Sequence, residues 1–172
     1  VSSATGNHTL HAVGVARAIK YYKTNGVAIS SQGESSTSEG YVYEAINGAT
    51  NEQLPVIFVF QDNGYGISVP KEDQTANYYA ATNFEGFKNL RIIYCNGLDV
   101  FSSMNAMAIA KQFVLENCKP VIVHAHCVRM HSHSNSDRHE LYRDDDEIDA
   151  ARGRDPLIKF RKRLLFSEIF TE

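Results

Sequence analysis

The sequence predicts an α/β protein with an open, mostly parallel sheet and helices on both faces. Short apolar runs alternate along the chain with longer stretches in which apolar residues recur at helical spacing. The apolar runs are rich in β-branched and aromatic residues, as is typical of strands buried in a parallel sheet. Such an alternation favours parallel strands that are joined by helical crossovers.

The first half of the chain predicts one complete βαβ unit, with a right-handed crossover. An amphipathic helix is expected over residues 10–23 and a short buried strand over 26–30. A second helix is expected over 39–53, with Ser38 as its N-cap, because Val, Ala and Ile residues recur there at helical spacing. The apolar run 56–60 then predicts a central parallel strand.

The second half of the chain repeats this alternation. In order, we expect a helix over 77–87, a strand over 91–95, a turn over 96–99, an amphipathic helix over 100–117 and a strand over 120–128. A polar segment rich in His, Ser, Asp and Arg continues as far as Asp146 and predicts a long loop. The chain closes with a predicted helix over 155–170, which leads out of one α/β domain spanning residues 1–172.

The composition is that of an ordinary globular protein. Hydrophobic residues make up 43% and charged residues 22% of the 172 residues, enough to bury a core of ordinary size. A formal net charge of −3 argues against nucleic acid or an anionic membrane surface as the main partner. No apolar run approaches the roughly 18 residues that span a bilayer. The chain does not begin with Met, and we expect it to be part of a longer protein.

The cysteine usage predicts the redox compartment. Cys95, Cys118 and Cys127 are widely spaced and odd in number, which fits reduced thiols better than a disulfide framework. We therefore expect a cytoplasmic protein in a bacterium, or a protein of the mitochondrial matrix in a eukaryote.

Polar side chains follow two consecutive predicted strands at their carboxyl ends. Glu34 lies in the stretch SSQGESSTSEG after the first strand, and Asn63 lies in VFQDNGYGIS after the second. Since ligands of open α/β sheets bind beyond the carboxyl ends of the strands, we expect the two side chains side by side. Mg²⁺ takes about six oxygen ligands, commonly one or two carboxylates together with phosphate oxygens and water. We therefore expect the Glu34 carboxylate, the Asn63 amide oxygen and the backbone carbonyl of Tyr65 to bind Mg²⁺ that holds a diphosphate.

The residues around Glu34 also suit an anion. The four hydroxyl residues 35–38 precede a predicted helix, whose free N–H groups and positive dipole end attract phosphate. Gly33 and Gly64 let the backbone approach a ligand closely. Taken singly, each motif is more typical of a solvated loop with a helix cap, or of a common turn. Their spacing around one βαβ unit favours the metal site.

The polar segment after the last predicted strand is dense in titratable groups. It contains three histidines, three arginines and an aspartate: His131, His133, His139, Arg129, Arg138, Arg143 and Asp137. A solvated loop, a zinc site built on His-x-His and a catalytic loop are the competing interpretations. In a catalytic loop, a histidine would donate a proton near neutral pH and an arginine would pair with phosphate.

Two long segments resemble motifs of one enzyme family. GESSTSEGYVYEAINGATNEQLPVIFVFQDNGYGISVP is similar to the thiamine-diphosphate motif of 2-oxo acid dehydrogenases, decarboxylating component, and VRMHSHSNSDRHELYR is similar to a loop of their α subunits. NGLDV and LHAVGVARA resemble two further segments in the same order, so the resemblance covers nearly the whole chain. It implies the diphosphate-binding domain of the thiamine-diphosphate-binding fold. It also implies thiamine diphosphate and Mg²⁺ as cofactors, decarboxylation of a 2-oxo acid, and transfer of the acyl group to lipoamide.

The resemblance implies a role for each matching residue. Glu34, Asn63 and the Tyr65 carbonyl would bind Mg²⁺, and Arg129 would contact the diphosphate. His133 would face the thiazolium ring, where it would stabilise or protonate intermediates and help to pass the acyl group to a lipoyl arm. The diphosphate pocket would be lined by further residues: Ser3, Thr5, Gly33, Ser35 and Ser36.

Three departures from the family pattern bear on the site. Glu34 replaces a commoner Asp, as in some branched-chain members, which favours a 2-oxoisovalerate-type enzyme over a pyruvate-type one. Ser35 replaces a glycine and restricts the backbone beside the phosphate. Asp62 replaces the first residue of an Asn-Asn pair, so a negative charge near the diphosphate must be screened or turned away.

The resemblance also implies partners. A β subunit, or a fused β region, would supply the aminopyrimidine-binding half of the site in an α₂β₂-type oligomer. A lipoyl-bearing acyltransferase component would accept the acyl group. By itself, the chain is expected to bind one end of the cofactor and to catalyse nothing. Two alternatives stay open: an acetoin-type thiamine-dependent dehydrogenase, and a non-catalytic scaffold that has lost the cofactor.

Overall fold

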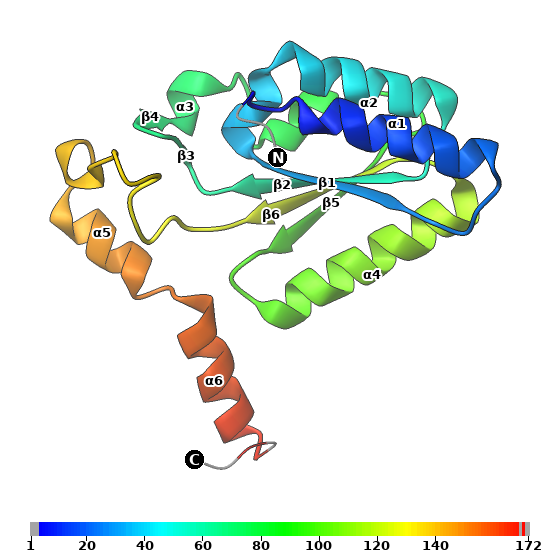
Figure 1. The fold of residues 1–172 in the computed structure, drawn as a ribbon. Coiled ribbons are helices and arrows are strands. Elements are labelled where there is room, and N and C mark those ends of the chain that lie inside the picture. The colour runs from blue at the N-terminus through cyan, green and yellow to red at the C-terminus, as the bar shows by residue number, and fades with distance from the viewer. Residues whose placement is uncertain (1–3, 169, 171–172) are drawn as a thin grey trace.

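A four-stranded sheet lies at the centre of the protein (Figure 1), for which a computed structural model describes residues 4–168 and 170. The strands are β1 (Ala28–Gly33), β2 (Val56–Asp62), β5 (Arg91–Asn96) and β6 (Val121–His126). Every pairing in this sheet is parallel, and the spatial order is β1-β2-β6-β5. The predicted open parallel sheet is therefore confirmed.

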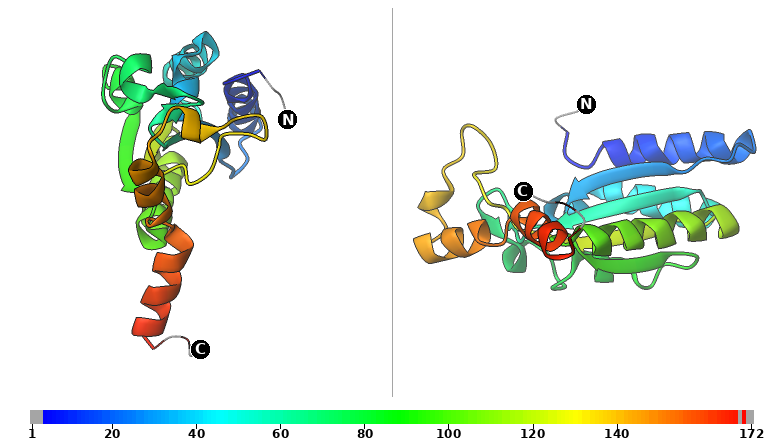
Figure 2. Two further views of the ribbon diagram at one scale, coloured as in Figure 1. Left: turned by 90° about the vertical axis from the view of Figure 1, so that its left-hand side faces the viewer. Right: turned by 90° about the horizontal axis from the view of Figure 1, so that it is seen from below.

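Helices cover both faces of the sheet, as predicted (Figures 1 and 2). α1 (His8–Tyr21) and α2 (Gly40–Glu52) lie on one face, and α4 (Val100–Asn117) lies on the other. Two further helices, α5 (Asp145–Arg152) and α6 (Pro156–Phe166), follow the last strand, and α6 projects away from the sheet. In the described part of the chain, no helix is both long enough and apolar enough to cross a membrane.

Strand β2 has a core on each side because alternate strand residues point to opposite faces. Phe58 and Phe60 pack in the cluster formed with α1 and α2. Ile57 packs on the other face, against α4. The stripe of α4 that covers this face repeats every fourth residue and consists of small side chains: Ala106, Ala110 and Val114. Burial on both faces fixes the register of β2 and hence the position of its carboxyl end.

The carboxyl ends of the strands lead into short, irregular segments. β1 continues into the 3₁₀ turn η1 (Glu34–Ser38). β2 continues into a small hairpin of β3 (Tyr65–Gly66) and β4 (Val69–Pro70), followed by the single turn α3 (Lys71–Gln74). β6 continues into the polar segment, which contains the 3₁₀ turn η3 (His139–Leu141). These segments together form the edge at which the sequence predicts the site.

Three local predictions were wrong. Ser38 ends η1 and does not cap α2, whose N-cap is Glu39; the Ser38 hydroxyl instead accepts a hydrogen bond from the Gln74 side chain (2.6 Å). Of the helix predicted over 77–87, only η2 (Ala80–Phe84) forms, because Tyr79 is extended and packs its ring against His124. The long loop ends earlier than predicted, at Asp144, whose carboxylate caps α5 by accepting from the Glu147 N–H (2.7 Å).

Candidate functional site

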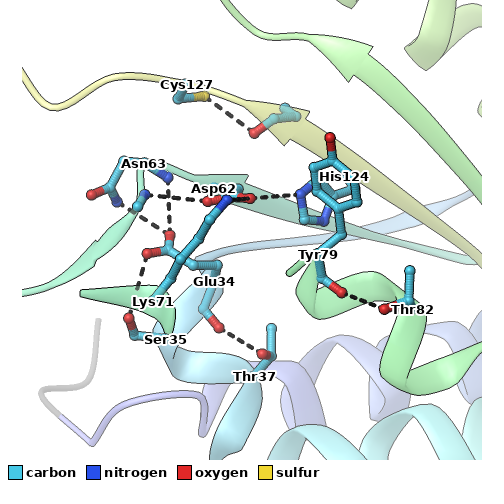
Figure 3. A network of polar contacts seen from close by, with 12 residues as sticks. Glu34, Ser35, Thr37, Asp62, Asn63, Lys71, Tyr79, Thr82, His124 and Cys127 are labelled. Carbon is cyan, nitrogen blue, oxygen red and sulfur yellow. Dashed lines mark hydrogen bonds and ion pairs between the residues drawn. The ribbon is translucent and has the colours of Figure 1, made fainter. Parts of the chain in front are cut away.

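Glu34 and Asn63 lie side by side at the ends of β1 and β2, as predicted (Figure 3). Glu34 Oε2 accepts hydrogen bonds from the backbone N–H of Asn63 (3.1 Å) and from its side-chain amide (3.3 Å). Glu34 is 1% exposed, and this burial raises the pKa of its carboxyl group, although the Asn63 N–H acts in the opposite direction. A buried carboxylate of this kind is stabilised by a cation that binds to it.

The side-chain oxygen of Asn63 is available to such a cation. This Oδ1 atom is buried and has no hydrogen-bond partner among the described residues. Buried polar atoms in folded proteins are rarely left unpaired, so an orphan oxygen beside a buried carboxylate fits a group that both can bind. Mg²⁺ meets this requirement because it takes carboxylate and amide oxygens together with phosphate oxygens. The pair Glu34 and Asn63 therefore fits the predicted metal.

The hairpin packs closely over η1. A Cβ atom on Gly66 would lie 2.5 Å from Ser35 Oγ, so the absent side chain of Gly66 makes room for Ser35. Gly64 has a φ of +86°, a left-handed conformation that favours glycine. The side chain of Gln74 donates to the Ser35 carbonyl (2.9 Å) and holds that backbone in place. This packing explains how Ser35 is accommodated where the family pattern has a glycine.

The other residues predicted to line the diphosphate pocket lie around the same edge. Gly33 ends β1, with open space where a Cβ atom would lie. Ser36 is half-buried in η1, and Thr5 is exposed in the turn before α1. That turn lies against η1, since a Cβ atom on Gly6 would be 3.4 Å from the Ser36 carbonyl oxygen. Ser3 lies outside the described residues, and the roles of all four residues stay predictions.

Arg129 lines a cavity beside the hairpin and has unpaired donors in its guanidinium group. The cavity has a volume of about 280 Å³, and among its lining residues are Asn63, Tyr65 and Arg129. The Arg129 Nη2 atom donates to the Tyr142 hydroxyl (2.7 Å). Its Nε and Nη1 atoms are buried without a partner in the part of the chain that the structure describes. Guanidinium donors of this kind match the oxygens of a phosphate group.

The Tyr65 side chain joins the hairpin to α5. Its hydroxyl donates to Glu147 Oε2 (2.9 Å), and the guanidinium groups of Arg129 and Arg143 each lie 5.3 Å from its ring centroid. Arg143 donates to Glu147 Oε1 (2.8 Å) and to the Arg129 carbonyl (2.9 Å). Burial raises the pKa of Tyr65, and the Glu147 carboxylate adds to this effect. Metal binding by the Tyr65 carbonyl stays a prediction.

The histidines of the polar segment have different surroundings. His139 is buried, with Nδ1 3.3 Å from Arg143 Nη1 and Nε2 3.4 Å from a Glu140 carboxylate oxygen. His131 and His133 are exposed, and the backbone N–H of His133 donates to Asp137 Oδ2 (2.7 Å). No three His, Cys, Asp or Glu side chains within the described residues are grouped to hold a metal ion, so the zinc interpretation has no support. The catalytic role of His133 stays a prediction.

Asp62, Lys71 and His124 form a buried cluster that sequence patterns did not reveal. Asp62 Oδ2 lies 3.0 Å from Lys71 Nζ and 3.0 Å from His124 Nε2. Burial acts to raise the pKa of Asp62, but the hydrogen bonds from His124 and Lys71 outweigh it and hold the pKa below its usual value. The sequence around Lys71 gave no sign of burial, because a lysine after a turn is typical of a surface position. The one signal was Asp62, which replaces an asparagine of the family pattern and whose negative charge requires a cation nearby.

Comparison with known families identifies the family of the chain. The sequence profile described as dehydrogenase E1 component matches residues 2–172. The chain belongs to the dehydrogenase E1 component family. This E1-family chain is 35% identical over 167 residues to the mitochondrial pyruvate dehydrogenase E1 component subunit alpha of Solanum tuberosum, covering 93% of the chain and 40% of that relative. The family predicted from the sequence is therefore confirmed.

Relatives of two substrate types are similar to this E1-family chain. It is 32% identical over 161 residues to the pyruvate dehydrogenase E1 component subunit alpha of Rickettsia felis, covering 92% of the chain and 48% of the relative. It is 30% identical over 162 residues to the mitochondrial 2-oxoisovalerate dehydrogenase subunit alpha 2 of Arabidopsis thaliana, covering 94% and 34% respectively. The chain thus spans less than half the length of these relatives, and the predicted branched-chain preference gains no support from them.

Proposed function

We propose that this chain binds the diphosphate end of thiamine diphosphate through Mg²⁺, within the E1 component of a 2-oxo acid dehydrogenase complex. The main support is the position of the Glu34 carboxylate beside the unpaired, buried Asn63 Oδ1 atom. Arg129 adds a second support, because it lines the neighbouring cavity and has unpaired guanidinium donors, and a cation and an arginine together neutralise a diphosphate.

The residues of this chain would divide the work of binding. Glu34, Asn63 and the Tyr65 carbonyl would hold the metal, and Arg129 would pair with a phosphate oxygen. Hydroxyl and backbone N–H groups around the diphosphate would come from Thr5 in the turn before α1, from Gly33 at the end of β1, from Ser35 and Ser36 in η1, and from Ser3. When bound, thiamine diphosphate supplies the electron sink for decarboxylation, while the protein supplies binding, orientation and electrostatics.

His133 would hold and deliver a proton at an imidazole nitrogen. It lies on an exposed segment, and its backbone is fixed by the Asp137 carboxylate (2.7 Å). An exposed histidine can serve as a general acid or base and can be reached by a large acyl acceptor. We infer that it acts in protonation and in transfer of the acyl group to a lipoyl arm.

The complete enzyme would act on a 2-oxo acid with the help of partners. A β subunit or fused β region would supply the aminopyrimidine-binding half of the site in an α₂β₂-type oligomer, and a lipoyl-bearing acyltransferase would take the acyl group. Its location would be the cytoplasm of a bacterium or the mitochondrial matrix of a eukaryote. The branched-chain substrate rests on Glu34 alone, so turnover of pyruvate, 2-oxoisovalerate and acetoin by the reconstituted enzyme decides the substrate.

Calorimetric titration of thiamine diphosphate into the full-length protein, with its partner subunits, tests the proposed function. We expect binding with Mg²⁺ and none with a chelator. Asn63→Ala should weaken Mg²⁺-dependent binding by on the order of 100-fold, because it removes one metal ligand. Asn47→Ala, at an exposed position of α2, is the matched control and should bind like the parent. Equal affinity in the Asn63→Ala protein would overturn the metal assignment, and no binding by the parent would favour a scaffold without cofactor.

A further inference from the structure

Asp62 places a second negative charge close to the proposed cation site. Its carboxylate is 0% exposed, whereas the family pattern has a neutral asparagine at this position. Together with Glu34, an unbalanced Asp62 would oppose a bound diphosphate, and it would also be costly to bury. Lys71 removes this problem, because its Nζ atom lies 3.0 Å from Asp62 Oδ2 and its side chain is itself almost completely buried (Figure 3).

Lys71 also holds the backbone around Asn63. The backbone N–H of Lys71 donates to the Gly64 carbonyl (3.0 Å), while its Nζ atom donates to Asp62. Asp62 Oδ1 accepts from the Gly64 N–H (3.2 Å), which closes a turn around Asn63. The residues immediately before and after Asn63 are therefore both bound to Lys71. Such double anchoring restricts the directions in which the Asn63 side chain can point.

Three ring side chains pack around the pair of Asp62 and Lys71. His124 donates to Asp62 from the neighbouring strand β6 and is 1% exposed. The ring of Tyr78 lies over Lys71, with its centroid 3.9 Å from Nζ, and the ring of Tyr79 packs edge-on against His124. With little water near, the charges of Asp62 and Lys71 must stay paired, since removing one partner leaves a buried charge alone. The pair thus acts as a rigid unit beneath the turn.

We propose that Lys71 is a positioning residue of the cation and diphosphate site: paired with Asp62 and backed by His124, it fixes the turn that holds Asn63 against Glu34. This inference rests on the proposed function and deepens it. Lys71 acts through Asn63, which itself would contact the metal. Asp62 and Lys71 form one unit, so the loss of either should disturb the turn, and the joint replacement of both by neutral residues should disturb it less.

A double-mutant cycle in the full-length protein with its partner subunits tests this unit. The variants are Lys71→Met, Asp62→Asn and the double variant Asp62→Asn/Lys71→Met. Lys71→Arg is the conservative variant, and Lys111→Met, at an exposed position of α4, is the matched control. Two quantities are measured: the affinity for thiamine diphosphate at fixed Mg²⁺, well below the unfolding temperature, and the unfolding midpoint without cofactor.

We expect both single variants to weaken cofactor binding, by on the order of tenfold for Lys71→Met. The double variant and Lys71→Arg should recover affinity to within about threefold of the parent. Lys71→Met should also lower the unfolding midpoint by roughly 5–10 °C. If Lys71→Met does not fold, the affinities of Asp62→Asn and of the double variant are compared instead, because this pair measures the same coupling. The inference is overturned if the double variant binds cofactor no more tightly than Asp62→Asn.

Three outcomes would contradict the inference. If the Lys71→Met protein is less stable but binds the cofactor with parental affinity, Lys71 contributes to stability and does not position the site. If the Asp62→Asn protein binds the cofactor more tightly than the parent does, the cluster affects binding only through the charge of Asp62 and not by fixing the turn. A parent protein that binds no cofactor would overturn the proposed function together with the inference, whereas the first two outcomes leave the proposed function intact.

Discussion

The strand-end site (Glu34, Asp62 and Asn63) and the His133 loop (residues 127–144) are built in opposite ways. In the strand-end site, the carboxylates are almost completely buried and lie within hydrogen-bond distance of a neighbour. In the His133 loop, His133 itself is exposed, as are the neighbouring hydroxyl residues Ser134 and Ser136. One region is fixed by the sheet beneath it, and the other is held by a few side-chain contacts.

The difference follows from what each region is proposed to do. A metal and a diphosphate need oxygen atoms at fixed positions, and residues at the ends of buried parallel strands provide them. Delivery of a proton and transfer of an acyl group to a large arm need access from solvent. The His133 loop is held by a few contacts, among them Tyr142 to Asp137 within the loop (2.7 Å) and Tyr65 to Glu147 on helix α5, which directly follows the loop (2.9 Å). Mutations should therefore be able to impair cofactor binding and proton transfer separately.

The largest effect should come from the sheet that supports the strand-end site. Phe60→Ala should lower the free energy of unfolding by about 3–5 kcal/mol, because it empties a buried position next to Phe84. Leu141→Ala, in the His133 loop and 77% exposed, should change it by no more than about 0.5 kcal/mol. Urea unfolding of both proteins without cofactor measures the difference. Similar losses in the two variants would mean that the loop is as much a part of the cooperative core as the sheet.

The next largest effect should be on the reaction rate, with the stability of the fold unchanged. His133→Gln should reduce acyl transfer by the reconstituted enzyme by about 100-fold or more, and cofactor affinity and the unfolding midpoint should stay at parental values. His131→Gln, exposed in the same loop, serves as the control. Steady-state rates with a lipoyl acceptor, together with calorimetry, give the two readouts. A loss of cofactor affinity as large as the loss of turnover would place His133 in the binding region.

The smallest effect concerns the contact between the hairpin after β2 and helix α5, which directly follows the His133 loop. Tyr65→Phe keeps the ring between the arginines but removes the hydrogen bond to Glu147, which is worth about 1 kcal/mol. Amide hydrogen exchange in residues 127–144 should then become roughly fivefold faster, while exchange in β2 should stay unchanged. Tyr41→Phe, at an exposed position of α2, is the control. Unchanged exchange in the loop would show that other contacts hold it.

The sequence could predict the positions of side chains that regular strands place. Glu34 and Asn63 follow consecutive strands of one βαβ unit, and such strands usually lie next to each other, as β1 and β2 do here. Hydrophobic patterning predicts the two strands, and the usual pairing of consecutive strands predicts the contact between these side chains.

Side chains placed by irregular segments could not be predicted in this way. Lys71 reaches Asp62 because the hairpin turns the chain back on itself, and no periodicity encodes that turn. Helix α5 was missed because its acidic first turn is typical of a solvated loop, and only two of its residues, Ile148 and Ala151, are buried. The buried cluster and the α5 contacts both depend on tertiary packing that overrides local preference.

The strand order has a consequence for how the chain is made. β6 is the last of the four sheet strands in the sequence, yet it lies between β2 and β5. During synthesis, β1 and β2 can pair early, whereas β5 has no strand to join until residues 121–126 have left the ribosome. Until then, the inner edge of β2 offers unpaired backbone groups in a very apolar stretch, which attracts other extended chains. We therefore expect that the chain folds slowly, that its nascent form is prone to aggregation, and that its yield in a cell depends strongly on chaperones that shield this edge.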